Sequence, residues 1–534
     1  MSLVWSVALA LVAPAPQGPP PPPSPAAATT DTGVFDAAAY LRQGPLAEAL
    51  TPQPGGLTAD KVAVQAVAES PSVAAKEAQI QAAAAKLDQT MIAFLPQISG
   101  KAGYTRLSKA AINFGNISSV VATGDGAPLK GQDPVALGPC SANPLSICSY
   151  NTETGMEGSP VVLVGAPPTD IKIPLNSYSL QAQLGLPISD YILSLLPAKR
   201  GSETRRDAVA LARDAERVKV ETDARIAYYN WLRTIASVVA VEDSLRRVKA
   251  RAVDVENLFH AGSATKAEVM RLAAQIAQIE QAINDAKVFR ATAEQGLAIM
   301  LNDRDLGFVP GEDVIDLPPD LPDLGNLNHL IDEAQSKRLE LKSMEKSVGA
   351  IDYGIKATRA GYFPRLDGFA DATYANPNQR FFPLAPVWRG SWSLGVQLSY
   401  SLNSALRTRA EIREYKANKR ELVAQIELLR RGIAMEVTQA YLARNKAIAD
   451  IELSARTLES AVEAYRVASE LFAAGSATTN DIIDAEADQL TAILRIVNSR
   501  IDLRTANARL LYATGRIKPN TVQVYDTRDK GTRG

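Results

Sequence analysis

The sequence offers few of the residues on which enzymes and metal sites depend. Its 534 residues include only two histidines and two cysteines, so we expect no metal site and no histidine-based catalysis. It contains no phosphate-binding loop of the Walker type and no nucleophile elbow, and we predict neither a catalytic site nor a cofactor. The 57 basic and 58 acidic residues nearly cancel, which indicates no general attraction to nucleic acid.

Long apolar runs are absent as well. No run in the body of the chain reaches the roughly 18 apolar residues of a transmembrane helix. The chain begins with MSLVWSVALALVAPA, which is too short to span a bilayer, and continues with QGPPPPPSPAAATT. We interpret 1–30 as a signal-like segment and a proline-rich linker of a secreted protein. The match is imperfect, because the first basic residue is Arg42 and Pro16 follows the A-x-A at Ala13–Ala15.

The two cysteines, Cys140 and Cys148, lie close together in the stretch LGPCSANPLSICSYN. An isolated close pair in a Pro/Gly/Ser/Asn-rich region predicts a local disulfide formed in an oxidising compartment. The alternative is a pair of ordinary free thiols. No C-x-x-C is present, so nothing supports a redox or zinc motif.

A repeated phrase indicates how the chain is organised. LFHAGSATKAEVMR at 258–271 returns as LFAAGSATTNDIID at 471–484. The segments around it also recur, as the pairs 66–107 with 333–375 and 177–189 with 391–403. The repeat predicts two copies of one unit, each with the order helix, strand, loop, strand, long helix, turn, helix.

The offset between the copies falls from 268 residues (Pro96 to Pro364) to 214 residues (Ser177 to Ser391). This drop places an insertion of about 54 residues in the first copy, within 106–174. The predicted divisions are the signal-like segment 1–30, the first repeat 31–302, the linker 303–326, the second repeat 327–515 and the C-terminal tail 516–534.

Both copies carry long helical patterns. Apolar residues step by three and four on both sides of each repeated turn, which predicts a coiled-coil seam. In the first copy the seam comprises Val238, Val241, Leu245, Val248, Ala252, Val255 and Phe259, then Val269, Leu272, Ile276, Ile279 and Ile283. In the second it comprises Ile451, Ala455, Leu458, Val462, Tyr465 and Phe472, then Ile483, Ala487, Leu490, Leu494, Val497 and Ile501. A helix over about 204–258 would be roughly 80 Å long, too long for a compact enzyme.

The strand segments alternate as outer-membrane strands do. In 178–188 and in 392–402 the even positions are apolar and the odd ones small or polar, with aromatic residues near the ends. A soluble strand with one face on a core is the usual alternative, but the opposite faces are too polar to form one. Weaker strands are expected near 97–105 and 365–374. Four strands cannot close a transmembrane barrel, so the chain must oligomerise.

The duplication, the two x-Pro joins from helix to strand and the repeated turn give the sequence a resemblance to the TolC-type outer-membrane efflux protein family, over about 57–515. This family supplies the outer component of tripartite exporters and type I secretion systems. The resemblance implies a mainly α fold with a membrane β-barrel portion. Three chains of four strands each would form a twelve-stranded barrel continuous with an α-helical tunnel.

The resemblance also implies a location and partners. It implies a homotrimer in the outer membrane of a Gram-negative bacterium, with most of its mass in the periplasm. The implied partners are a periplasmic adaptor, an inner-membrane transporter and outer-membrane lipid. The insertion at 106–174 would be a long surface loop at the outer end of the barrel, and the linker 303–326 would belong to a belt around the tunnel.

The repeated phrase matches the hairpin turns of that family. Gly262 and Gly475 are expected in the left-handed conformation that ends a helix. Capping-box spacing is present in the pairs Thr265 with Glu268 and Thr478 with Asp481. The resemblance implies that the turns dock an adaptor, while a well-made turn without a partner is the alternative. The expected docking residues are Gly262, Ser263, Ala264, Thr265, Gly475, Ser476, Ala477 and Thr478.

The resemblance also places a pore constriction at the second turn. Asp481 and Asp484 correspond to carboxylates that line the closed entrance in the family, and three-fold symmetry would stack them as two acidic rings. Asp481 has an alternative role as a helix cap. The family's arginine and aromatic hydroxyl are replaced here by Ala477 and Phe472, so any closure would rest on packing of Phe472 and Phe259.

Two rival interpretations remain open. A soluble periplasmic coiled-coil scaffold or adaptor would explain the heptads but not the duplicated strands. A metal-efflux outer component gains nothing from a sequence with two histidines and seven methionines.

Overall fold

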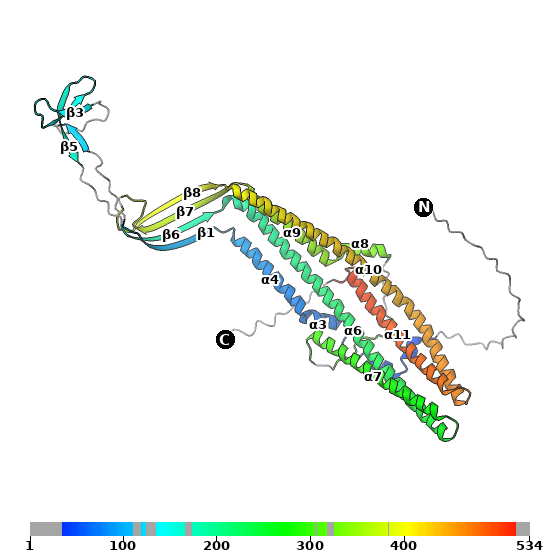
Figure 1. Ribbon diagram of the computed structural model, residues 1–534. Coiled ribbons are helices and arrows are strands. Elements are labelled where there is room, and N and C mark those ends of the chain that lie inside the picture. The colour runs from blue at the N-terminus through cyan, green and yellow to red at the C-terminus, as the bar shows by residue number, and fades with distance from the viewer. Residues whose placement is uncertain are drawn as a thin grey trace, which may run out of the picture.

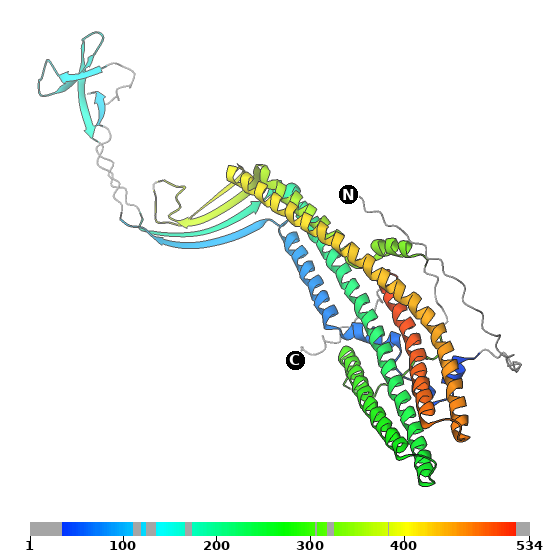
Figure 2. The same ribbon diagram turned by 45° about the vertical axis from the view of Figure 1, so that its right-hand side comes forward.

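The computed structural model describes residues 35–109, 119–123, 135–165, 174–304, 307–317, 325–382 and 384–518. Long helices run side by side, and a four-stranded sheet continues from one end of them, which makes the molecule strongly elongated (Figures 1 and 2). The shorter helical elements are α1 (Ala37–Leu41), α2 (Pro45–Leu50), α3 (Ala59–Glu69), α4 (Pro71–Ile92), α5 (Ile188–Asp190), η1 (Tyr191–Leu195), α8 (Leu327–Lys337), α9 (Leu339–Thr358) and η2 (Arg359–Tyr362).

Four longer helices form two hairpins. They are α6 (Leu196–His260) with α7 (Lys266–Leu301), and α10 (Leu402–Ala473) with α11 (Thr479–Ala513). With 65 and 72 residues, α6 and α10 are about 100 Å and 110 Å long at 1.5 Å per residue. The helix predicted over about 204–258 therefore exists and begins earlier. Pro197 is its second residue, and the π-helical turn η1 directly precedes the helix.

The predicted seam is buried over part of its length in α6 and α7, where Val248, Val255 and Leu272 are at most 1% exposed, whereas Phe259 at its end is 37% exposed. On α11 the prediction is partly wrong. Ala487 is exposed, and the buried face also contains the polar residues Glu486 and Gln489. A search for apolar periodicity does not detect polar residues that are buried by pairing with a neighbouring helix.

The strands that continue from the helices form one antiparallel sheet in the order β1 (Gln97–Arg106), β6 (Asn176–Leu186), β7 (Arg365–Asn376), β8 (Arg389–Ser399). The register aligns equivalent faces across all four strands. One row on the apolar face is Ile98, Leu184, Ala370 and Leu394, and one row on the polar face is Lys101, Gln181, Thr373 and Ser391. Apolar and polar residues therefore alternate along all four strands, as is required when the two faces of a sheet meet different environments.

The insertion at 106–174, predicted as a surface loop, contains a second sheet. Its strand order is β2 (Ser119–Thr123), β5 (Glu157–Gly165), β4 (Ile147–Asn151), β3 (Val135–Pro139). It lies beyond the end of the first sheet that is farthest from the helices (Figure 1). Cys140 and Cys148 are joined by a disulfide, which ties the end of β3 to β4. β-branched residues within this surface segment pair as short strands, a feature that the prediction of a loop did not include.

The largest apolar cluster lies midway along the helices, around the fully buried Trp231 of α6. Helices α1 to α3 and residues 307–317 of the linker pack against this region. The hydroxyl of Tyr228 donates to the carbonyl of Leu57 at 2.7 Å, and Leu57 forms a β-bridge with Pro310. The N-terminal segment and the linker are therefore held together on the same part of α6.

No helix in the described part of the chain is both long and apolar enough to cross a membrane.

Candidate functional site at the hairpin turns

The two repeated turns have the same backbone geometry. Gly262 and Gly475 follow the incoming helices with φ angles of +76° and +70°. In each turn the N–H of the next serine donates to the carbonyl of the leucine five residues earlier, at 2.8 Å. This left-handed ending satisfies carbonyls that the helix leaves without partners, and only glycine adopts it without steric cost.

We predict that Gly475→Ala lowers the thermal stability of the protein, whereas Gly432→Ala does not. Alanine in the left-handed region costs about 1–2 kcal/mol. Gly432 lies within α10 with open space around an added Cβ, so alanine there should stabilise by about 0.5–1 kcal/mol. Thermal unfolding followed by circular dichroism compares the two. Equal unfolding midpoints for both variants would show that the left-handed glycine contributes nothing to thermal stability.

Capping boxes begin both outgoing helices, as predicted. The Thr478 N–H and hydroxyl both donate to the Asp481 carboxylate at 2.7 Å, and the Asp481 N–H donates to the Thr478 hydroxyl at 3.3 Å. Thr265 and Glu268 make the same three contacts. Hydrogen bonds from Thr478 lower the pKa of Asp481, and those from Thr265 lower the pKa of Glu268. Both carboxylates are therefore held in the charged form at neutral pH.

The expected docking residues form the exposed end of each hairpin. Six of the eight are exposed, and the two alanines are half-buried. Ala264 packs against the small apolar cluster of Val248, Val255 and Leu272. The available surface of the turns therefore consists of backbone and small polar side chains, which would let another helical tip approach closely.

Asp481 and Asp484 both lie exposed on the first turns of α11. Asp481 is occupied as a cap, which was the alternative that the sequence left open. Asp484 is one turn further along the helix, and its i, i+3 spacing from Asp481 places the two on one face.

Phe472, expected to help to constrict the pore, packs within the chain itself. Its ring contacts the cluster of Val248, Val255 and Leu272. The guanidinium of Arg251 lies over the ring, 5.2 Å from its centroid. The constriction hypothesis therefore depends on the two aspartates more than on Phe472.

The two hairpin tips also contact each other, which the sequence did not predict. The Thr479 hydroxyl donates to Glu268 at 3.2 Å, and Arg271 Nη1 donates to Asn480 at 2.6 Å. These four residues occupy the first turns of α7 and α11. Of these four, only Glu268 was singled out from the sequence, as a capping-box residue.

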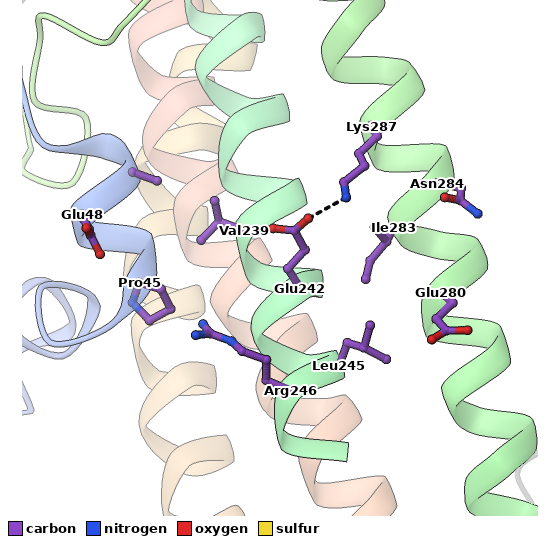
Figure 3. A pocket seen from close by; sticks show the side chains of 11 residues that line it. Pro45, Glu48, Val239, Glu242, Leu245, Arg246, Glu280, Ile283, Asn284 and Lys287 are labelled. Atoms are coloured by element: carbon purple, nitrogen blue, oxygen red, sulfur yellow. Dashed lines mark ion pairs between the residues drawn. The ribbon is translucent and has the colours of Figure 1, made fainter. Parts of the chain in front are cut away.

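A groove runs between α6 and α7 beside α2 (Figure 3). Its volume is about 870 Å³, and the ion pair of Lys287 with Glu242, at 2.8 Å, crosses between the two helices. Leu245 and Ile283 of the predicted seam line it, together with Pro45 of α2. The groove lies on the shaft of the hairpin and away from its turn.

Comparison with known proteins identifies relatives of this chain. Residues 330–516 match the model of the family described as outer membrane efflux protein. The outer membrane efflux protein BepC of Brucella suis biovar 1 is 20% identical over 405 residues, which cover 72% of this chain and 80% of that protein.

Solved structures share the fold at low sequence identity. The Campylobacter jejuni CmeC outer membrane channel matches with a TM-score of 0.63 and 16% identity, over 86% of each chain. The open state of the Neisseria gonorrhoeae MtrE outer membrane channel matches with a TM-score of 0.63 and 14% identity, over 86% of this chain and 88% of that one.

Proposed function

We propose that this chain, which belongs to the outer membrane efflux protein family, gives its substrates a passive exit duct across the periplasm and outer membrane. Three copies would join their sheets into one twelve-stranded barrel and their helices into one tunnel. The observation that carries the proposal is the first sheet. Its edge strands β1 and β8 each pair on one side only among the described residues, and its apolar face is exposed. In lipid such edges must be closed, since every backbone group needs a partner there.

The dimensions of the sheet support insertion in a membrane. The 11 residues of β8 span about 35 Å, and a tilt near 40° reduces this to about 27 Å, close to the roughly 25 Å height of an outer-membrane apolar band. Two pairs of aromatic rings lie at its outer end: the centroids of Trp388 and Tyr374 are 5.0 Å apart in a stacked pair, and those of Tyr104 and Tyr178 are 5.0 Å apart in a tilted pair. Such girdles form where a barrel meets the lipid headgroups.

The two halves of the chain support a duplicated unit. The order α4, β1, β6, α6, α7 is matched by α9, β7, β8, α10, α11. The helices would occupy the periplasm, with the turns at Gly262 and Gly475 docking a periplasmic adaptor that connects to an inner-membrane transporter. The exposed small residues of both turns support this docking.

The disulfide supports the assignment of the second sheet to the cell exterior. Cys140 and Cys148 lie in the part of the chain beyond the outer end of the membrane sheet (Figure 1). Disulfides persist in the periplasm and on the cell surface, where the surroundings are oxidising.

A soluble scaffold is the main rival, and the apolar face of the sheet argues against it. Trp392, Leu394, Val396 and Leu398 are each at least 70% exposed in the single chain. A soluble monomer rarely exposes a contiguous apolar patch of this kind.

We expect the full-length protein to fractionate with outer membranes, to need detergent for extraction, and to form discrete pores in a planar bilayer. Cross-linking of the extracted protein should give trimers, because one closed barrel needs three copies of four strands. Heat-denatured protein at the same concentration is the control for detergent artefacts. Folded protein that is extracted without detergent and forms no pores would support the scaffold instead.

A further inference from the structure

A depression of about 830 Å³ lies on the apolar face of the first sheet, within the size range of ligand pockets. The residues of this face that line it fall in two neighbouring rows across all four strands. Most of them are small, namely Gly100, Ala102, Ala182, Ala372 and Gly390. The larger side chains of Leu180, Tyr374 and Trp392 stand at its border. Such a hollow in an otherwise bulky apolar face fits a hydrocarbon chain laid along the sheet.

The depression ends below the level of the lipid headgroups. The aromatic ring of Tyr178 follows Leu180 on the same face and lies 6.2 Å from that of Trp388. Arg106, the last residue of β1, is on this face four residues beyond Ala102, about 13 Å along the strand. A lipid whose chain filled the depression would therefore bring its headgroup to Arg106.

The outer end of the sheet is strongly basic. The stretches that form it contain two lysines and three arginines, a formal charge of +5, and no aspartate or glutamate. These stretches are 97–109, 174–186, 372–382 and 384–399. Arg106 and Lys109 are both exposed there. Basic residues at this level attract the charged headgroups of anionic lipids.

A second arginine reaches the depression from the opposite side. Nη1 of Arg380 donates to the carbonyl of Trp392 at 2.8 Å, while the side chain stays exposed. Arg106 of β1 and Arg380 beside β8 therefore stand on two sides of the depression. A guanidinium group has several N–H donors in one plane, which suits the oxygens of a phosphate group.

The inner end of the sheet gives a contrast. Arg365 at the start of β7 pairs with Asp190 at 3.3 Å and with Asp367 at 3.1 Å. Its charge is therefore balanced within the chain, and nothing there favours an anionic lipid. The basic excess is confined to the outer end, so the lipid that fits belongs to the outer leaflet.

We propose that the depression binds an acyl chain of lipopolysaccharide, the phosphorylated glycolipid of the outer leaflet, and that Arg106 and Arg380 bind its phosphates. The depression and these two arginines are named the outer lipid site. The inference rests on the proposed function, because it requires the apolar face of the sheet to lie in the outer membrane. The lipid is recognised twice, by its chain in the depression and by its phosphate charge above it.

The test measures lipid binding to delipidated trimers by native mass spectrometry. The probes are lipid A, the same lipid without its phosphates, and phosphatidylglycerol. The double variant Arg106→Gln/Arg380→Gln removes two charges, and glutamine keeps an N–H donor for the Trp392 carbonyl. We expect it to bind lipid A about thirtyfold more weakly than wild type, the effect of two basic residues at a charged lipid surface. Binding of the dephosphorylated lipid should not change.

A second variant fills the depression and leaves the charges in place. Ala182→Leu/Ala372→Leu adds apolar volume on the lipid-facing side, so trimers should still form. Lipid A and its dephosphorylated form should both bind about tenfold more weakly, as when about two methylene groups of the chain are no longer buried. Lys101→Gln is the matched control, because it removes a charge from the polar face of β1. It should bind all three lipids as wild type does.

The outcomes separate the inference from the function. Wild-type protein that forms neither trimers nor pores would overturn the proposed function. Wild-type channels that bind lipid A no better than its dephosphorylated form, or no better than the filled variant does, would overturn the outer lipid site and leave the channel intact. The same loss in Lys101→Gln as in the arginine variant would also overturn it. Phosphatidylglycerol bound as tightly as lipid A would overturn the assignment to lipopolysaccharide.

Discussion

Leu394→Arg is expected to abolish assembly of the protein in the outer membrane. Leu394 is the middle residue of β8, lies on the apolar face and is 76% exposed in the single chain. An arginine on the lipid face at the bilayer midplane costs about 2–4 kcal/mol, so three copies in one barrel cost about 6–12 kcal/mol. That is comparable with the whole stability of a typical domain. The measurement is the amount of cross-linked trimer in the outer-membrane fraction.

Ser393→Arg is the matched control, because it places the same side chain on the next residue of the strand. Ser393 lies on the polar face, where its hydroxyl donates to Asp371 at 3.2 Å. The new arginine would face the duct beside that carboxylate, and trimers should form normally. If both variants assembled equally, the apolar face would not be in contact with lipid. If Leu394→Arg became more soluble and otherwise normal, the scaffold would be favoured.

The parts of the fold that the sequence predicted are those fixed by local chemistry. The left-handed glycines, the capping boxes and the strand alternation each depend on a few neighbouring residues and on the same face pattern in both copies. The pairing of Cys140 with Cys148 was predictable for a similar reason, since the two are only eight residues apart. Periodicity and turn chemistry suffice for such features.

The missed features are those that require two distant segments to meet. Glu486 and Arg247 form an ion pair although they are 239 residues apart, and each looks like an ordinary surface charge in its own helix. The contact of Arg271 with Asn480 spans 209 residues and depends on how the hairpins lie against each other. The second sheet was missed because its short strands lie in Pro/Gly/Ser-rich sequence that indicates a loop.

Asp484→Asn is expected to lower the preference of the pore for cations. In three-fold symmetry Asp484 would place three carboxylates around the duct. An ion about 8 Å from each gains roughly 0.5 kcal/mol per charge in water, about 1.5 kcal/mol in total, which is close to tenfold in selectivity. Salt at 0.1 M has a Debye length of about 10 Å and should reduce the effect to about threefold. Reversal potentials in asymmetric salt measure the change.

Low pH gives an independent test of the ring that Asp481 would form in a trimer. Its pKa is lowered by hydrogen bonds from Thr478, so its charge persists to lower pH than that of an ordinary aspartate. The contribution of this cap to stability is present above the pKa of the unfolded chain and is lost as the pH falls through the lower, folded value. Cation preference should therefore survive mild acidification in the Asp484→Asn variant and disappear only in stronger acid.

Glu268→Gln tests whether the cation preference of the pore depends on which of the two turns carries the charge. Glu268 lies six residues after Gly262, as Asp481 lies six residues after Gly475. It caps α7 through Thr265 and contacts Thr479 across the tips. Glutamine keeps the capping geometry and removes the same single charge per chain. If only the second turn lines the duct, Glu268→Gln leaves the reversal potential unchanged while Asp484→Asn shifts it. Equal shifts would mean that both turns face the ion path, and the constriction would then belong to both hairpins.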